Sequence, residues 1–279
     1  MTPTRDINEL RRIARKIRLD IVQMVGPGQK GHFGGSCSSA DIVTALYFSK
    51  MHHDPANPAW ADRDRFLLSK GHSALVQYAA LAECGYFPRA ELAKLKTLGA
   101  MLQGHPDRNT TPGIEANTGS LGQGLSLACG MAAGHKIDGR TCRVYCVLGD
   151  GEIAEGQIWE AAMAAAHYKL DNVVAILDRN GLMTNGSTDV RYSSSPIDQK
   201  WRAFGWHVQD IDGHDLPAIL QALDRAEEAD GQPKMIIART VKASGIPFAE
   251  GRAEFHNGIM SPEQYAEACR MLAAEPAAT

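Results

Sequence analysis

Short apolar segments alternate with helical patterns along most of this chain of 279 residues, and this alternation limits the possible folds more than any other feature. The apolar, strand-like segments are 65–69, 143–148, 172–177, 206–211 and 234–239. The helical patterns between them are 72–84, 121–137, 156–168 and 214–229. Such alternation predicts an α/β fold: an open, mostly parallel β-sheet flanked by helices on both faces.

The carboxyl ends of two of these segments carry unusual polar residues. The segment 143–148 leads into "GDG", which is Gly149, Asp150 and Gly151, and the segment 172–177 leads into "DRNGL" with Asn180. Open α/β sheets bind their ligands at this edge. A carboxylate at the mouth of an apolar core costs free energy unless it is paired, hydrogen-bonded or holding a metal. We therefore expect a cation beside Asp150.

The two strand ends together indicate a metal site. A carboxylate from Asp150 and an amide oxygen from Asn180 are hard donors that suit Mg²⁺ or Ca²⁺, with a diphosphate and water completing the shell. Taken singly, Asp150 is explained as a helix cap and Asn180 as a turn residue. The spacing of 30 residues (180 − 150) at consecutive strand ends favours the metal–diphosphate interpretation.

Composition argues against several classes of partner. A formal net charge of −3 gives no electrostatic reason to expect a nucleic acid or membrane surface. The basic stretch "RRIARKIR" belongs to an amphipathic pattern of Ile7, Leu10, Ala14, Ile17, Ile21 and Met24, which predicts a first helix.

Six cysteines without a CxxC pair predict reduced thiols in a cytoplasmic protein. The sequence "GPGQKG" at 26–31 follows a helix, which argues against a dinucleotide site.

The GDG motif followed at this distance by asparagine resembles the thiamine diphosphate-binding motif. Three further blocks resemble transketolases: "GHFGGSCSSADIVTALYF" at 31–48, "DRDRFLLSKGHSALVQYAALAECGYF" at 62–87 and "GHPDRNTTPGIEANTGSLGQGLSLACGMA" at 104–132. The resemblance extends from the first helix to about residue 260. It implies the thiamine diphosphate-binding fold and a transferase that moves a two-carbon ketol unit.

Carried over residue by residue, the resemblance implies a set of site residues. The metal ligands are Asp150, the side chain of Asn180 and the backbone carbonyl of Leu182. The cofactor-binding residues are His72, Gly119, Ser120, Leu121, Gly149, Gly151, Asn180 and His256. The catalytic residues are His32, His72, His105, His256 and Glu155. His32 and His105 would face the sugar hydroxyls, and Glu155 would belong to a carboxylate network between active sites.

Four of the histidines also indicate a site independently of the resemblance. His32, His72 and His105 each follow a glycine in a loop, and His256 lies in the segment 241–260, which has no regular period and is expected to close over a ligand. Groups that titrate near neutrality, or neutral donors, guide protons on and off hydroxyls. His135, His167, His207 and His214 lie in predicted helices or strands and are expected to be structural.

Three departures from the family are visible. Phe33 replaces the usual proline after His32 and is expected to change the wall of the substrate funnel. The stretch "FHNG" at 255–258 replaces a tighter His-Gly ending. The chain is expected to be a single diphosphate-binding domain, 1–279, with no room for a pyrimidine-binding domain or a C-terminal domain.

The resemblance therefore implies a partner chain, the C-terminal transketolase subunit, in a heterotetramer with two of each chain. The partner chain would supply the glutamate that activates the cofactor. It would also supply the residues that bind the phosphate or sulfonate of a sugar-phosphate-like substrate. The cofactors are thiamine diphosphate and Mg²⁺, with Ca²⁺ an alternative. Two other functions stay open: a subunit of an enzyme like deoxyxylulose-phosphate synthase, and a non-catalytic regulatory subunit with a vestigial site.

Overall fold

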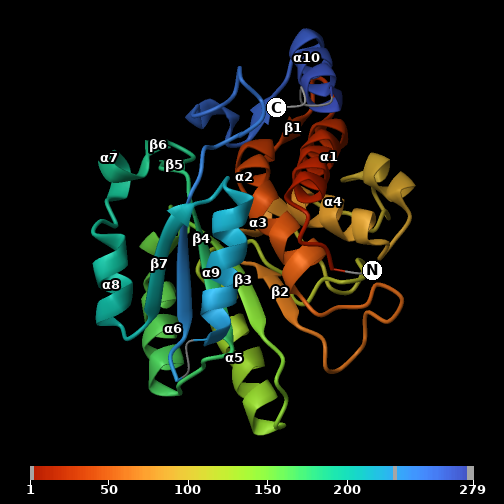
Figure 1. The fold of residues 1–279 in the computed structure, drawn as a ribbon. Helices are drawn as coiled ribbons and strands as arrows, with labels where there is room; N and C mark the ends of the chain where they lie inside the picture. The colour runs from red at the N-terminus through yellow and green to blue at the C-terminus, as the bar shows by residue number, and fades with distance from the viewer. Residues whose placement is uncertain (1–2, 229–230, 275–279) are drawn as a thin grey trace.

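A parallel sheet of five strands forms the centre of the computed structural model, which describes residues 3–228 and 231–274. The strands are β2 (Arg65–Leu68), β3 (Val144–Gly149), β4 (Val173–Arg179), β7 (His207–Asp212) and β8 (Lys234–Arg239). Their order across the sheet is β2-β3-β4-β8-β7, and every neighbouring pair is parallel. All five carboxyl ends therefore meet at one edge, as Figure 1 shows.

Helices cover both faces of the sheet because side chains alternate between the faces along each strand. On β3, for example, Tyr145 and Val147 belong to one apolar cluster, and Cys146 and Leu148 belong to the other. The first cluster includes α1 (Ile7–Val25), α2 (Phe33–Ser38), α3 (Ala40–Ala45), α4 (Ala74–Cys84) and α9 (Leu216–Glu228). The second includes α5 (Gln123–Ile137), α6 (Gly156–His167) and α8 (Ile197–Ala203).

Smaller elements surround the carboxyl edge. The hairpin strands β5 (Leu182–Met183) and β6 (Gly186–Ser187) lead into the short helix α7 (Thr188–Tyr192). The two-residue strands β1 (Lys30–Gly31) and β9 (Gly258–Ile259) pair antiparallel, although they are far apart in sequence. The helix α10 (Pro262–Ala273) follows β9 and packs on α1 (Figure 1). The β1–β9 pair brings the loops of His32 and His256 together.

The predicted fold class is confirmed, and the strand boundaries differ by one or two residues. One placement is wrong: His214 lies in the turn after β7, before α9 begins at Leu216. The segment 241–260 has little regular structure, as its lack of period indicates. All six cysteines are free thiols. Among the described residues, no helix is both long and apolar enough to cross a membrane.

Candidate active site

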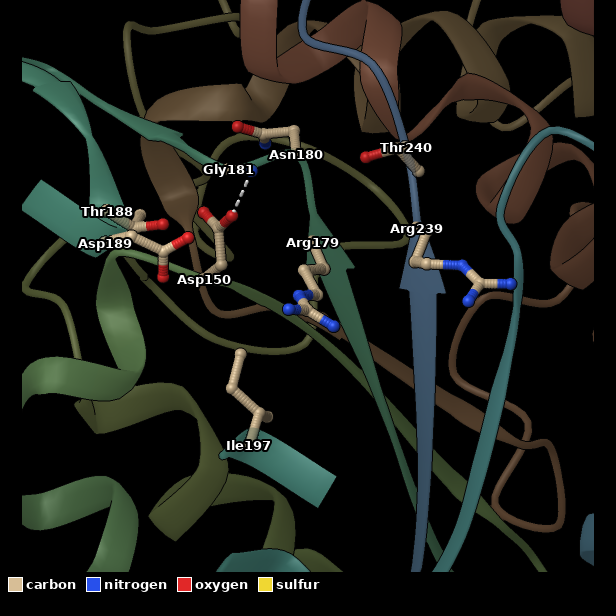
Figure 2. Close-up of a pocket in the computed structure, with 9 residues that line it drawn as sticks. All are labelled: Asp150, Arg179, Asn180, Gly181, Thr188, Asp189, Ile197, Arg239 and Thr240. Carbon is tan, nitrogen blue, oxygen red and sulfur yellow. Dashed lines mark hydrogen bonds between the residues drawn. The ribbon is translucent and has the colours of Figure 1, made fainter. Parts of the chain in front are cut away.

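Asp150 and Asn180 line one cavity of about 260 Å³ at the carboxyl edge of the sheet (Figure 2). Asp150 is 4% exposed, and its two carboxylate oxygens accept hydrogen bonds from the Gly151 amide at 2.9 Å and the Gly181 amide at 2.5 Å. Burial raises the pKa of Asp150 to about 6, and the nearby charge of Asp178 adds to this rise. A carboxylate with this environment is stabilised by a cation.

The side chain of Asn180 is oriented by two hydrogen bonds. Its Nδ2 donates to Asp178 Oδ2 at 3.2 Å, and its Oδ1 accepts from the Leu182 amide at 3.1 Å. The described residues hold no group of three or more His, Cys, Asp or Glu side chains that could bind a metal. One carboxylate, one amide oxygen and the main chain are instead a hard, incomplete oxygen set, which fits a divalent cation whose remaining ligands come from a diphosphate and water.

A buried ion pair lies directly behind this cavity. Lys70 Nζ donates to Asp178 Oδ2, and also to the Gly35 carbonyl at 2.8 Å and Ser39 Oγ at 2.6 Å. Asp178 is fully buried and also accepts from Ser38 Oγ at 2.7 Å and from Thr240 Oγ1. Lys70 and these hydroxyls hold the pKa of Asp178 down, at about 2, despite its burial. The pair connects separate segments of the chain at the sheet edge.

Three of the predicted histidines form one cluster. The ring centroids of His32 and His72 are 5.2 Å apart, those of His32 and His256 are 5.6 Å apart, and those of His72 and His256 are 5.0 Å apart. His32 and His256 come from loops and His72 from the short 3-10 helix Gly71–Ser73, and the three are distant in sequence. The tertiary structure therefore assembles what the glycine–histidine pattern indicated.

Lys242 is a buried cation beside this cluster. Its side chain is 2% exposed, and its Nζ lies 3.3 Å from His256 Nδ1. Among the described residues, no carboxylate forms an ion pair with it. Burial lowers the pKa of Lys242 to about 8. The carboxylates of Asp178 and Asp150 favour its charged form without forming an ion pair with it, so this buried lysine can also bind an anion at the site.

Burial keeps the three clustered histidines neutral. The pKa of His72 falls to about 2, mainly through burial and then through the charge of Lys70. Burial also lowers the pKa of His32 to about 4, and that of His256 to about 3 with Lys242 contributing. At neutral pH these imidazoles donate or accept hydrogen bonds without carrying charge.

Glycines allow the loops around the cluster to touch. A Cβ on Gly71 would lie 2.4 Å from the carbonyl carbon of Thr118, and a Cβ on Gly119 would lie 2.4 Å from His105 Cδ2. Gly119 also has a φ of +136°, which L side chains rarely adopt. His105 is exposed beside Gly119, and among the described residues no ring contact joins it to the other three histidines. It lies at the rim.

The remaining predicted residues lie around these groups. Ser120 is exposed and Leu121 is half-buried just before α5, and Gly149 ends β3. A Cβ on Gly151 would lie 3.1 Å from Met183 Cβ. Glu155 is exposed in front of α6 and packs against Gly122. Its predicted role in a carboxylate network stays a prediction.

Phe33 is not exposed at the site, and its expected effect on the wall of the substrate funnel stays a prediction. Its side chain is fully buried, and its ring packs against Phe255 with centroids 5.7 Å apart. Phe33 is the first residue of α2 and points into the apolar cluster shared with α1 and α4. An apolar ring at the start of a buried helix belongs to the core rather than to a polar site.

His214 is structural, but it anchors the closing segment. Its Nδ1 lies 2.8 Å from Asp41 Oδ2, and its Nε2 accepts from the Val241 amide at 2.9 Å. Asp41 also accepts from both terminal guanidinium nitrogens of Arg18, whose Nε donates to the Ser244 carbonyl at 3.0 Å. This network fixes the backbone on both sides of Lys242.

Several site residues were missed from the sequence, above all Lys70, Lys242 and Glu152. Glu152 is 2% exposed and accepts from Ser69 Oγ, from the Gly122 amide at 3.0 Å and from the Gly149 amide at 3.0 Å. Lys70 is a charge in a stretch that is otherwise apolar, polar-uncharged or glycine-rich, whereas Glu152 and Lys242 have other charged residues within three positions. The charged residues are visible in the sequence, but the sequence does not say which residue each of them contacts in the folded chain.

The fold and the site together define a class of protein. A parallel α/β sheet carries, at its carboxyl edge, a divalent-metal donor set, a buried lysine and a cluster of neutral histidines. Such an edge is suited to a diphosphate-containing cofactor and to proton transfer at a bound substrate.

Comparisons with known proteins agree with this class. Residues 9–279 match the family described as "Transketolase, thiamine diphosphate binding domain", and the chain belongs to this family. It is 44% identical over 272 residues to the 6-deoxy-6-sulfo-D-fructose transketolase subunit SqwG of Clostridium sp. (strain MSTE9), covering 98% of both chains. It is 40% identical to an apulose-4-phosphate transketolase subunit of Phocaeicola vulgatus, covering 92% of this chain and 91% of the relative.

Solved structures show the same fold. A transketolase from Campylobacter jejuni superposes with a TM-score of 0.91 at 30% identity, over 98% of this chain and 44% of that chain. A transketolase from Leishmania mexicana gives a TM-score of 0.87 at 30% identity, over 100% of this chain and 42% of that chain. The chain thus spans less than half the length of these solved transketolases. The prediction of an N-terminal transketolase subunit is confirmed.

Proposed function

We propose that this chain is a single diphosphate-binding domain that works with a second polypeptide in transferring a two-carbon ketol unit from a ketose to an aldose. The observation that carries the proposal is the cluster of His32, His72 and His256 beside Lys242, next to the oxygen pair of Asp150 and Asn180. Relatives named as separate transketolase subunits, matched over nearly their whole length, support a partner chain.

We propose that the cofactor and the metal bind at the carboxyl edge of the sheet. Asp150, Asn180 and the Leu182 carbonyl would hold Mg²⁺, while Lys242, His72 and His256 would face the diphosphate. When bound, thiamine diphosphate supplies the nucleophile and the electron sink for breaking the bond between C2 and C3 of the ketose. Ca²⁺ takes the same oxygen donors, but with about six to eight ligands at longer distances than the octahedral Mg²⁺, so the choice of metal is tested by titration.

The histidines would move the protons that this reaction needs. Cleavage removes a proton from the C3 hydroxyl of the donor, and transfer returns one to the carbonyl oxygen of the acceptor. A neutral imidazole offers one acceptor and one donor nitrogen to these hydroxyls, and burial keeps His32 and His256 neutral in the chain without substrate. His105 at the rim would hydrogen-bond further sugar hydroxyls. The partner chain would contribute the glutamate that activates the cofactor.

The substrates are proposed to be anionic sugars. The relatives named above act, by their names, on a sulfonated sugar and on a sugar phosphate. The neutral histidines of this chain suit hydroxyl groups, so the anionic group must be bound elsewhere. A soluble, cytoplasmic assembly with two of each chain completes the proposal.

Purification of the tagged chain from its own cells tests the proposal. We expect a second chain in equal amount, and ketol transfer only when both chains, thiamine diphosphate and Mg²⁺ are present. Ketol transfer by the pure single chain, or purification of the chain alone as a stable oligomer, would overturn it. A pyruvate donor arm tests the synthase-like alternative, and an assembled complex that binds the cofactor without turnover would favour a regulatory role.

A further inference from the structure

The two ring nitrogens of His214 connect the turn after β7 to α3 and to the segment 241–260. Nε2 accepts from the Val241 amide at 2.9 Å, and Nδ1 lies 2.8 Å from Asp41 Oδ2. Because a backbone amide can only donate, Nε2 carries no proton, and the imidazole is neutral with its proton on Nδ1. Nδ1 therefore donates to Asp41. This bond selects the tautomer whose Nε2 can accept from Val241.

Asp41 is itself held in place, so the imidazole rests on a fixed support. Its carboxylate is buried and accepts from Arg18 at 3.0 Å and 2.5 Å. The Nε of the same arginine donates to the Ser244 carbonyl at 3.0 Å. The backbone is thus anchored by His214 just before Lys242 and by Arg18 two residues after it.

The backbone between these two anchors is strained at Ala243. This residue is fully buried and has a φ of +59°, a conformation that residues with a Cβ rarely adopt. Its amide donates to the Gly34 carbonyl at 2.9 Å. Such strained residues persist only where surrounding contacts hold them, and they concentrate at functional sites. The turn 241–244 therefore depends on its anchors.

The turn presents the buried side chain of Lys242 to the site. Lys242 Nζ lies 3.3 Å from His256 Nδ1. Burial lowers the pKa of this lysine, and the charges of Asp178 and Asp150 counteract that change. The ammonium is therefore close to both the histidine cluster and the metal cavity. If the turn were released, this charge would leave the site.

We propose that His214 is a positioning residue: by accepting from the Val241 amide, it keeps the turn 241–244 in the conformation that places Lys242 at the site before any cofactor binds. This rests on the proposed function, in which Lys242 faces the cofactor diphosphate. His214 does not line the metal cavity, so it acts through the backbone of the turn. A turn that is already formed spares cofactor binding the free energy of ordering it.

Two substitutions separate the hydrogen bonds of His214. His214→Asn places an amide nitrogen where Nδ1 lies, so it keeps a donor to Asp41 but leaves the Val241 amide without an acceptor. His214→Gln places an amide oxygen close to the position of Nε2, so it keeps the acceptor for Val241 and loses the bond to Asp41. His167→Asn, at the exposed end of α6, is the control.

The variants are compared in the complete complex of both chains. We expect His214→Asn to weaken Mg²⁺-dependent binding of thiamine diphosphate by on the order of 5-fold, with kcat at saturating cofactor unchanged. Without cofactor, hydrogen–deuterium exchange of residues 241–251 should be faster in this variant than in wild type. His214→Gln and His167→Asn should stay within about twofold of wild type in both measurements.

Three results would overturn the inference. The first is unaltered exchange and affinity in His214→Asn. The second is a greater loss in His214→Gln than in His214→Asn, because the bond to Asp41 would then be the important one. The third is equal destabilisation of both variants in urea with unaltered cofactor affinity, which would make His214 purely structural.

The exchange measurement separates this inference from the proposed function. If wild type binds no thiamine diphosphate, the proposed function fails. Faster exchange of residues 241–251 in His214→Asn alone would then still support the role of His214 in holding the turn, and equal exchange in all variants would overturn it.

Discussion

The buried pair of Lys70 and Asp178 gives the sharpest test of how the site is held. In Asp178→Asn, the buried Lys70 loses its counter-ion, and an amide offers one acceptor oxygen where the carboxylate offers two. Asp178 now accepts from Lys70, Ser38, Ser39, Thr240 and Asn180. The carboxylate is fully buried, and the lysine side chain is 3% exposed. Bulk solvent therefore cannot compensate for the lost charge.

Two magnitudes follow from this geometry. Removing one partner of a buried ion pair costs about 3–5 kcal/mol of unfolding free energy. The substitution also releases Asn180 Nδ2, which now donates to Asp178 at 3.2 Å and so fixes which atom of the amide faces the cavity. Loss of a residue that orients a metal ligand typically weakens metal affinity by about 10- to 100-fold. We expect both effects in the same variant.

Urea unfolding of the free chain, followed by tryptophan fluorescence, measures the first effect, and Mg²⁺-dependent binding of thiamine diphosphate measures the second. Asp189→Asn is the matched control, because Asp189 lines the same cavity but is exposed. The double variant Lys70→Met with Asp178→Leu separates the two effects: it should recover stability but not metal affinity. A change of less than about 1 kcal/mol in Asp178→Asn, with unaltered Mg²⁺ affinity, would refute the reasoning.

Four further outcomes are expected. Thiamine diphosphate with Mg²⁺ should raise the melting temperature of the complex, and chelation by EDTA should remove that rise; a rise that survives EDTA contradicts the role of Asp150. Lys242→Met should stabilise the free chain by about 1 kcal/mol, because it removes a buried charge that forms no ion pair among the described residues and that Asp178 and Asp150 stabilise only from a distance. It should also weaken cofactor binding by roughly tenfold or more; urea unfolding measures the gain in stability, and calorimetry measures the loss of affinity. Gly119→Ala should destabilise the chain, because Gly119 has a φ of +136° and an added Cβ would clash with His105. Gly130→Ala in α5 should be stabilising, because an added Cβ there has no atom within 4 Å and alanine favours the helix. Urea unfolding of both variants measures the two changes. In the unfolded chain His72 binds a proton near pH 6.5, whereas in the folded chain burial lowers its pKa to about 2 and keeps the imidazole neutral. As the pH falls below 6.5 the unfolded state therefore binds more protons than the folded state, and the unfolding free energy decreases. The unfolding free energy of wild type relative to His72→Asn should then fall by about 1.4 kcal/mol per pH unit between about pH 6 and 4, and a constant difference would contradict the buried, neutral histidine.

Much of the fold was readable from the sequence because its causes are local. Alternating strands and helices, glycines at strand ends and the amphipathic first helix each follow from side-chain period and backbone freedom. His214 was misplaced because the predicted helix 214–229 begins two residues before α9 does, and the turn that holds His214 is fixed by distant partners, Asp41 and the Val241 amide. That the ring of Phe33 is buried against Phe255 was not readable from the sequence, because the two residues meet only after the chain has folded.

The sequence by itself determined the sheet, its carboxyl edge and the residue types that gather there, since periodicity and strand-end motifs are properties of short stretches. Only the tertiary structure decided which charges meet. Lys70 and Asp178 are 108 residues apart. The interaction of two buried charges depends on their separation and on the water they exclude, and neither is encoded in a local pattern. The same is true of the three neutral histidines, whose pKa values are set by burial that exists only after the loops have packed.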